Sequence, residues 1–425
     1  MKLDTEKPEF WESAKLEAEL RRVFDVCNGC RRCYNLCPSF NDLFQRLDRE
    51  DVDGDAEKLG GADFQSVTDL CYQCKLCFNH CPYTPPHRWD LDFPRLMLRS
   101  RAIQTRRSGR LLQDRFLGDV DRIGRIGSRL APLVNWLNRN PVHRWLLEKT
   151  VGIHRDRILP RYARQTFRQW YEKRETTSPA GGGKKAALFY TCTVNFNQPS
   201  VGRAAIRVLE KNGVQTGCPE QRCCGMPFLD GGDLESAKKS AAANVSSLHD
   251  WVRRGFDIVV LAPTCSYVLK REYPELLQTE AAKEVAAKAL DVCEYLMALH
   301  AEGRLDTGFV RSAGKIAYQM PCHLRAQNIG YKSRDLMQLI PGTSVRTIER
   351  CAAIDGTWGL KRQYFELSLK VARPLLDELA VEKPDRIVSD CALAGLQIEQ
   401  GCGKKPLHPV EVVAIAYGLS EEGDT

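Results

Sequence analysis

Residues 27–38 read CNGCRRCYNLCP and residues 71–82 read CYQCKLCFNHCP, so one cysteine pattern occurs twice. Its spacing, C-x2-C-x2-C-x3-C-P, is typical of thiolate ligands to cubane iron–sulfur clusters. Where a chain holds two such clusters, the first three cysteines of a run bind one cluster and the fourth binds the other. We therefore predict two [4Fe–4S] clusters, one bound by Cys27, Cys30, Cys33 and Cys81 and the other by Cys71, Cys74, Cys77 and Cys37.

A disulfide framework and paired zinc sites explain these cysteines less well. A zinc ribbon needs two pairs of cysteines rather than two runs of four that each end before proline. Residues 1–15 (MKLDTEKPEFWESAK) mix charges of both signs and contain no apolar signal-peptide region. We therefore expect a reducing cytoplasmic location, where disulfides are rare. Most of the 18 cysteines among the 425 residues are expected to be metal ligands.

Residues 1–98 are predicted to form a helical ferredoxin domain that holds both clusters. Apolar side chains recur at helical spacing along residues 9–24 and 40–47. The acidic residues 48–61 have the composition of a solvated loop. The insert between the two cysteine runs is longer than a compact ferredoxin needs, which favours the mostly helical type over the small β-rich type.

Residues 99–184 are predicted to be a basic amphipathic helical segment followed by a linker. Residues 99–174 contain 19 Lys and Arg against 6 Asp and Glu, a net charge of +13. Three glycines weaken the helix prediction, because each costs about 1 kcal/mol relative to alanine inside a helix. The run TTSPAGGGKK at 176–185 has a flexible linker composition. The apolar positions recur every three or four residues: Leu112, Phe116, Val120, Ile123, Ile126, Leu130, Leu133 and Leu137.

Two roles remain open for this basic segment. Its charge, its apolar stripe and three tryptophans (Trp136, Trp145 and Trp170) would suit peripheral docking at a membrane surface. No stretch of the chain approaches the roughly 18 consecutive apolar residues that a spanning helix needs. Alternatively, the stripe packs against the neighbouring domains while the arginines face water. We expect no nucleic-acid partner, because no nucleic-acid-binding motif accompanies the charge.

Residues 185–310 and 311–425 are predicted to be two α/β repeats. In each repeat, cysteines follow strand-like stretches, with successive spacings of 31 and 42 residues in the first repeat and 29 and 40 in the second. Helical stretches such as 201–213 and 234–255 separate the strands, which favours a largely parallel sheet in each repeat. The candidate metal ligands are Cys192, Cys223, Cys224 and Cys265 in the first repeat and Cys322, Cys351 and Cys391 in the second.

Together these features resemble the heterodisulfide reductase-related CCG-domain family of iron–sulfur oxidoreductases. A ferredoxin domain before a duplicated CCG domain is similar to the iron–sulfur C subunits of anaerobic glycerol-3-phosphate dehydrogenases. The similarity is carried by CRRCYNLCPSF (30–40), CYQCKLCFNHCPY (71–83), MPCHLRAQNIG (320–330), LIPG (339–342) and GTWGLK (356–361). The resemblance implies a subunit that takes electrons from a flavin-containing dehydrogenase partner. Its clusters would pass them to a quinone or another carrier, with the chain peripheral at the inner face of the cytoplasmic membrane.

The sequence departs from the family pattern in both repeats. The full CCG motif ends in C-x2-C, but Val268 and Ala394 stand where the last cysteine is expected. In the second repeat, Cys-Cys-Gly has become Cys-Ala-Ala at residues 351–353. The first repeat retains four thiols, enough for an additional iron–sulfur cluster or a zinc site. The second is degenerate: its open position would be filled by His323, Asp355 or an exogenous ligand, or it is a relic without metal.

An electron-transfer subunit is the function that we expect from these observations. One alternative is a catalytic reductase, similar to heterodisulfide reductase, that acts on a disulfide or related substrate at a CCG-domain cluster. Another is a non-catalytic module in which metals stabilise the fold or sense redox state. No G-x-G-x-x-G motif opens a helix after a strand, so we expect no intrinsic dinucleotide or flavin site. The sequence identifies no catalytic residue, and two-electron chemistry on a substrate would fall to a partner.

Overall fold

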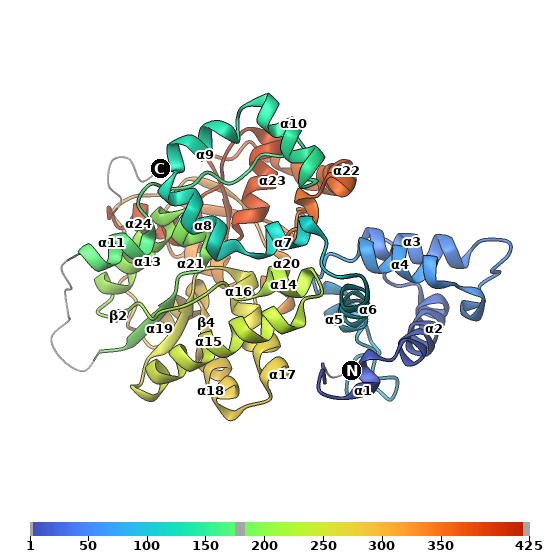
Figure 1. The fold of residues 1–425 in the computed structure, drawn as a ribbon. Coiled ribbons are helices and arrows are strands. Elements are labelled where there is room, and N and C mark those ends of the chain that lie inside the picture. Colours follow the sequence, from blue (N-terminus) through green and yellow to red (C-terminus); the bar gives the residue numbers. More distant parts are fainter. Residues whose placement is uncertain (1–2, 175–182, 420–425) are drawn as a thin grey trace.

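The chain folds into an N-terminal helical arm, a helical middle segment and two small parallel sheets covered by helices (Figure 1). The structure is a computed structural model that describes residues 3–174 and 183–419. Most of the linker predicted at 176–185 therefore lies outside the described residues. The mixed helical and α/β architecture agrees with the fold class predicted from the sequence.

The N-terminal arm is helical and projects from the side of the molecule (Figure 1). Its core combines aliphatic side chains with phenylalanines, and the rings of Phe40 and Phe93 stack with centroids 4.3 Å apart. The helix predicted over 9–24 is interrupted after Trp11, and the boundary predicted at residue 98 falls inside α6. The elements are α1 (Pro8–Trp11), α2 (Ser13–Cys30), α3 (Pro38–Leu47), η1 (Ala56–Lys58), α4 (Gly61–Leu70), α5 (Leu76–His80) and α6 (Phe93–Ser108).

The middle segment forms several short helices instead of one long amphipathic helix. Glycines let α8 approach its neighbours closely: a Cβ on Gly124 would come within 2.2 Å of the Phe196 ring, and one on Gly127 within 2.6 Å of Tyr162. These glycines, which weaken the helix by propensity, are therefore needed for packing. The helices are α7 (Leu112–Gly118), α8 (Val120–Arg129), α9 (Ala131–Leu137), α10 (Pro141–Thr150) and α11 (Phe167–Lys173).

Each repeat contains a parallel sheet with the same strand order. The first sheet has the order β2-β1-β3-β4 and the second β6-β5-β7, and the central strand pairs are in register at Ala187↔Ile258 and Ala317↔Ile387. The shared order supports the internal duplication that the cysteine spacing predicts. The strands are β1 (Lys185–Phe189), β2 (Gln215–Gly217), β3 (Asp257–Val260), β4 (Ala289–Asp291), β5 (Lys315–Gln319), β6 (Ser344–Ile348) and β7 (Arg386–Ser389).

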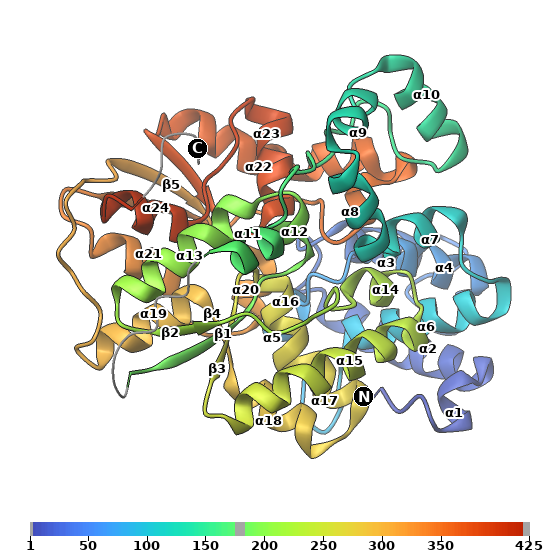
Figure 2. The ribbon, with the colours of Figure 1, turned by 60° about the vertical axis from the view of Figure 1, so that its left-hand side comes forward.

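Helices bury both faces of the first sheet, as is usual for parallel sheets. Figure 2 shows α13, α21 and α24 between the two sheets, and α24 contacts both α13 and α21. Val410 and Val413 of the second repeat join a core formed mainly by the first, so the repeats pack as one unit. The first repeat's helices are α12 (Cys192–Phe196), α13 (Pro199–Lys211), α14 (Met226–Asp230), α15 (Leu234–Arg253), α16 (Pro263–Tyr267), the π-helix η2 (Val268–Glu272), α17 (Tyr273–Leu277), α18 (Glu280–Lys288) and α19 (Val292–Ala301). The second repeat adds α20 (Cys322–Ala326), α21 (Lys332–Gln338), η3 (Trp358–Leu360), η4 (Arg362–Tyr364), α22 (Phe365–Glu382), α23 (Ala392–Cys402) and α24 (Pro409–Ala416).

Candidate metal centres

The first group of thiols lies where α2 and α5 end. Cys27 and Cys30 are in the last turn of α2, and Arg31 ends that helix in a left-handed conformation that turns the chain toward Cys33. Burial raises the pKa of the Cys27 thiol, and the charges of Cys33, Cys81 and Cys30 raise it further. The structure therefore brings Cys81, from the second run, beside the first three cysteines of the first run.

The second group surrounds the loop between α4 and α5. Gln73 and Lys75 have positive φ angles, which fold this loop tightly. Burial raises the pKa of Cys77, with contributions from Cys74, Cys71, Cys37 and Cys33. Cys37 therefore lies with the second run, and Cys33 of the first group is close enough to interact with it. The crossed ligand sets remain a prediction. They require Cys81 beside the first run and Cys37 beside the second, which is where the structure places these two cysteines.

The third group lies at the carboxyl ends of β1 and β3 in the first repeat. Ligands commonly bind where successive crossovers leave a parallel sheet in opposite directions, and the order β2-β1-β3 places that point between β1 and β3. Cys192 begins α12 after β1, and Cys265 lies in α16 after β3. The Sγ atoms of Cys265 and Cys224 are 3.3 Å apart. A hydrogen bond to Cys223 raises the pKa of Cys192, and burial adds to this effect.

The fourth group occupies the equivalent place in the second repeat. Cys322, Cys351 and Cys391 line a cavity of about 30 Å³ together with Asp355. The Cys322 Sγ lies 3.1 Å from Oδ2 of Asp355. Burial raises the pKa of Cys391 to about 11. The degenerate repeat thus retains three converging thiols and adds a carboxylate at their side.

His323 lies close to the fourth group, but both of its ring nitrogens already have partners. Nδ1 is 2.9 Å from Oγ1 of Thr264, and Nε2 is 3.0 Å from the carbonyl oxygen of Gln73. Because a carbonyl can only accept, Nε2 donates to Gln73, and the Nδ1 of a neutral ring accepts from Thr264. Of the two ligands considered for the open position, Asp355 is therefore better placed than His323.

The chemistry of the donor set fits iron–sulfur clusters. Buried thiols that interact with one another raise each other's pKa, and a bound cation would hold them as thiolates. Polar groups also reach the sulfurs: Nε2 of Gln73 lies 3.4 Å from Cys71 Sγ, and the Tyr83 amide nitrogen lies 3.4 Å from Cys81 Sγ. Hydrogen bonds of this kind tune cluster potentials.

Three other cysteines lie apart from these groups. Cys218 is buried beside Arg168, whose guanidinium donates a hydrogen bond to the Cys218 carbonyl oxygen at 2.7 Å. Cys293 is fully buried in α19, and Cys402 lies half-buried at the end of α23. Cys293 lies instead beside the buried carboxylates of Asp291 and Asp390.

Sequence reasoning missed a buried ion pair beside the second group. Lys75 Nζ lies 3.2 Å from Glu272 Oε1, and both side chains are at most 4% exposed. Lys75 belongs to the cysteine loop of the arm, whereas Glu272 belongs to the first repeat, so the pair joins the two. Lys75 stands inside a recognised motif, but nothing in the sequence indicates a partner almost 200 residues away.

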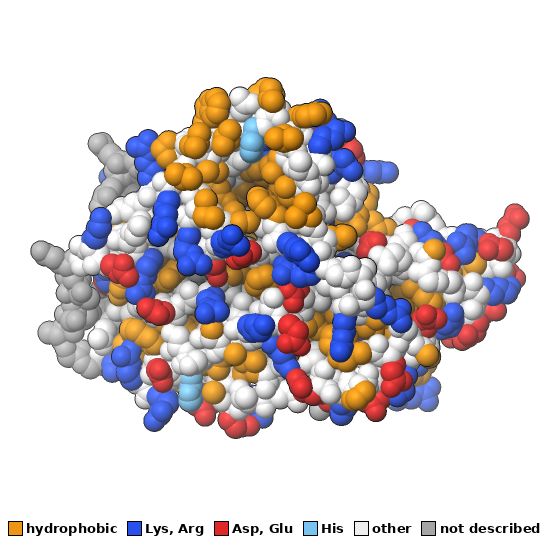
Figure 3. All heavy atoms as spheres, viewed as in Figure 1, with side chains coloured by type: hydrophobic (Ala, Val, Ile, Leu, Met, Phe, Trp, Pro, Cys, Tyr) orange, Lys and Arg blue, Asp and Glu red, His pale blue; other side chains and the backbone are white. Residues whose placement is uncertain are grey.

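The basic segment exposes most of its apolar stripe and buries some of its polar side chains. Arg144 and Glu148 of α10 are 5% exposed, whereas Trp145 is 47% exposed on the same helix. The predicted alternative is therefore wrong in packing the stripe inward, because most of the stripe is exposed, whereas arginines such as Arg122 and Arg125 do face water as it expects. Figure 3 shows hydrophobic side chains gathered over α8–α10 with basic ones beside them. We call the following residues the apolar face: Leu111, Leu112, Phe116, Ile126, Leu130, Leu133, Trp136, Val142, Trp145 and Leu146.

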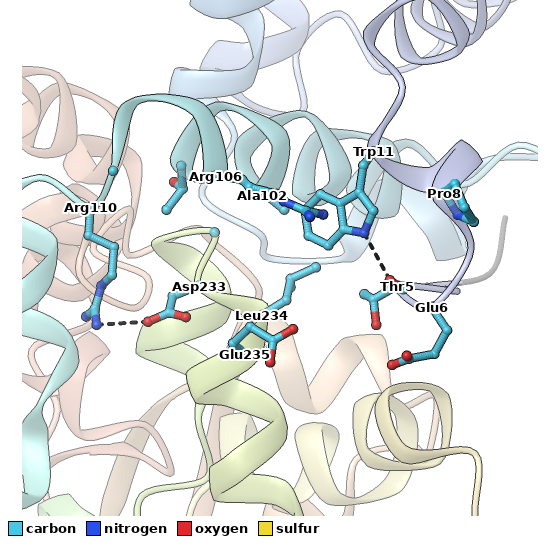
Figure 4. A pocket seen from close by; sticks show the side chains of 13 residues that line it. Thr5, Glu6, Pro8, Trp11, Ala102, Arg106, Arg110, Asp233, Leu234 and Glu235 are labelled. Atoms are coloured by element: carbon cyan, nitrogen blue, oxygen red, sulfur yellow. Dashed lines mark hydrogen bonds and ion pairs between the residues drawn. The ribbon is translucent and has the colours of Figure 1, made fainter.

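A larger hollow, of about 780 Å³, lies where α1, α6 and α15 meet. Figure 4 shows two polar contacts around it: Arg110 pairs with Asp233 at 2.8 Å, and the Trp11 indole donates to the Thr5 carbonyl oxygen at 2.9 Å. Its lining contains no cysteine. This hollow is therefore a poorer candidate for a redox centre than the four thiol groups.

Comparisons with known proteins agree with this organisation. The profile of the citrate utilization protein B Fer4-like domain matches residues 20–107, and that of the cysteine-rich CCG domain matches residues 186–270 and 316–399. The chain is 29% identical over 314 residues to the C subunit of anaerobic glycerol-3-phosphate dehydrogenase from Escherichia coli K12, covering 72% of this chain and 77% of that protein.

Two other relatives cover less of the chain. The B subunit of fumarate reductase (CoM/CoB) from Methanothermobacter marburgensis is 26% identical, over 55% of this chain and 45% of that protein. Lactate utilization protein A of Bacillus subtilis 168 is 27% identical, over 42% of this chain and 75% of that protein. The chain therefore carries a Fer4-like domain followed by two CCG cysteine-rich domains and is similar to iron–sulfur redox subunits.

Proposed function

We propose that this chain is an electron-transfer subunit that receives electrons from a flavin-containing dehydrogenase and delivers them to a quinone or another acceptor. The observation that carries the proposal is the placement of the candidate ligands in four groups around neighbouring loops. Iron–sulfur clusters supply one-electron transfer when bound. The protein's part is to hold these centres close together and to keep their ligands partly or fully buried.

The exposure of the groups supports a direction for the electrons. Cys27, Cys30, Cys33 and Cys81 are only half-buried, whereas the ligands of the first CCG repeat are mostly buried. The first group is therefore the place where a flavin-bearing partner would approach. The upstream substrate would be bound by that partner.

The other end of the proposed route lies beside the basic segment. Asp121 of α8 accepts a hydrogen bond from the backbone N–H of Cys223 at 2.8 Å. The helix that carries part of the apolar face thus touches the first CCG group. No helix in residues 3–174 or 183–419 is both long and apolar enough to cross a bilayer. We propose that the apolar face rests on the inner surface of the cytoplasmic membrane, where quinones dissolve.

Electron transfer can be tested with the anaerobically purified protein. Reduced flavin mononucleotide serves as donor and a water-soluble quinone analogue as acceptor. Cys223→Ser should slow quinone reduction while the ferredoxin-domain clusters remain reducible and visible by EPR; Cys402→Ser is the matched control. Unchanged quinone reduction in Cys223→Ser would contradict the route. Turnover of a disulfide substrate by the protein alone would support the catalytic reductase instead.

Membrane docking has a separate test. Replacing Leu133, Trp136 and Trp145 by serine should weaken sedimentation with anionic phospholipid vesicles, because each of these side chains is about half-exposed or more. Replacing Val310 and Val381, which are 70% and 79% exposed outside the segment, is the control. Equal binding by both variants, or no binding by the wild-type protein at low salt, would contradict docking through the apolar face.

A further inference from the structure

The second CCG repeat contacts both the ferredoxin domain and the first CCG repeat, and His323 lies where the three meet. This residue follows Cys322 and contacts two other ligand loops. Its Nε2 bonds to Gln73, between Cys71 and Cys74, and its Nδ1 contacts Thr264, which precedes Cys265. One side chain therefore connects loops from three thiol groups.

Direct contacts also join the second thiol group to the fourth. The hydroxyl of Tyr72, the residue after Cys71, lies 3.4 Å from Cys351 Sγ. Leu76, at the start of α5, lines the same cavity as Cys351 and Asp355. The cysteine loop of the ferredoxin domain therefore forms one wall of the site in the second repeat.

Helix packing joins the same sites. The helix α20, which begins at Cys322, packs against α5 of the ferredoxin domain and also against α16, which carries Cys265. The element that carries a ligand of the fourth group thus touches elements of both the second and the third group.

We propose that Cys322, Cys351, Cys391 and Asp355 bind an iron–sulfur cluster that links the ferredoxin domain to the first CCG repeat. Asp355 supplies the ligand that the Cys-Ala-Ala sequence has lost, from the position four residues after Cys351 and at 3.1 Å from Cys322. Three thiolates select a thiophilic centre such as iron–sulfur or zinc. Its place beside two other candidate redox centres favours iron, since zinc undergoes no redox change.

This inference rests on the proposed electron-transfer function and adds the order of its centres. Each transfer moves one electron and breaks no bond. The donor centre is oxidised by one electron as the next centre is reduced by one, and the reductant is the reduced flavin of the partner. The second repeat then takes part in electron transfer and is not a relic without metal.

Substitutions at Asp355 test the ligand. We expect Asp355→Ala to lose the iron of one centre while the EPR signals of the ferredoxin-domain clusters persist. Asp355→Cys should keep that iron and show a shifted midpoint potential, because a thiolate replaces a carboxylate. Asp377→Ala, which removes an exposed partner of Arg373 in the same repeat, is the control and should retain all iron. Full iron and an unchanged spectrum in Asp355→Ala would overturn the ligand assignment.

Metal analysis and kinetics test the position in the route. Zinc in place of iron at this site in the anaerobic wild-type protein would overturn the redox role. With reduced flavin mononucleotide as donor, Asp355→Ala should slow quinone reduction at least tenfold without slowing reduction of the ferredoxin-domain clusters. Unchanged quinone reduction in Asp355→Ala would overturn only the role of this cluster as a link between the other centres. Failure of the wild-type protein to hold ferredoxin-domain clusters or reduce quinone would instead refute the proposed function.

Discussion

Lowering the pH should destabilise the second CCG repeat through His408. The side chain is 6% exposed and caps α24, where Nδ1 accepts a hydrogen bond from the Val410 N–H at 3.1 Å. Nε2 is buried without a hydrogen-bond partner among the described residues. Protonation would therefore remove the cap acceptor and place a charge in the interior. Burial lowers the pKa of His408 from 6.5 to about 3.

The sign and size of the effect follow from proton linkage. The unfolded chain binds a proton below pH 6.5, whereas folded His408 stays neutral down to about pH 3. Stability is therefore full above pH 6.5 and decreases as the pH falls toward 3. At pH 5 the loss is about 2 kcal/mol. For a unit of roughly 150–250 residues this lowers the melting temperature by about 4–8 °C.

The variant His408→Asn isolates this contribution. Asparagine is a good N-cap residue and carries no titrating proton. The melting temperatures of the variant and the wild-type protein are compared by anaerobic differential scanning calorimetry at pH 7.5 and pH 5. The difference between the two melting temperatures at pH 7.5 gives the pH-independent effect of the substitution. Equal decreases of the melting temperature from pH 7.5 to pH 5 in the variant and in the wild-type protein would refute the reasoning.

Two further substitutions address the ferredoxin domain. Cys81→Ser should damage the cluster assigned to Cys27 and its neighbours, and loss of only the other cluster's EPR signal would contradict the crossed assignment. Lys75→Met should destabilise the protein by up to about 3–5 kcal/mol, because it leaves the buried Glu272 with only a longer contact to Arg95 at 3.9 Å. Denaturant unfolding measures this loss; the double variant Lys75→Met/Glu272→Gln should recover part of it, and no recovery would argue against the pair.

The sequence predicts well those features that depend on local spacing. The doubled cysteine run predicts clusters, and the Fer4-like match covers both runs. The cysteine spacings predict two α/β repeats, and the two sheets share one strand order. Strand-like stretches such as 386–389 form strands because apolar residues such as Ile387 and Val388 fill a buried sheet. In such cases the hydrophobic pattern and the sheet topology require the same arrangement.

Features that depend on tertiary packing could not be predicted in this way. Helical spacing in residues 112–137 indicates an amphipathic helix but not which face points inward. The structure packs the glycines of α8 against Phe196 and Tyr162 and leaves Ile126 half-exposed. Similarly, Asp355 and His323 were equal candidates in the sequence. The hydrogen bonds of His323 to loops far away in the chain distinguish them.

The loss of a motif cysteine need not mean the loss of a metal centre. Cys322 and Cys391 still follow neighbouring parallel strands, β5 and β7, so the sheet keeps them at the same edge. A carboxylate within 3.1 Å of one thiol can fill a vacant position without rearranging that sheet. Because oxygen is a harder donor than sulfur, such an exchange would alter the potential of the centre while preserving its place. On our proposal, the centre of the degenerate repeat therefore differs from the other three centres in its ligands and its potential. Its position among the four centres stays the same.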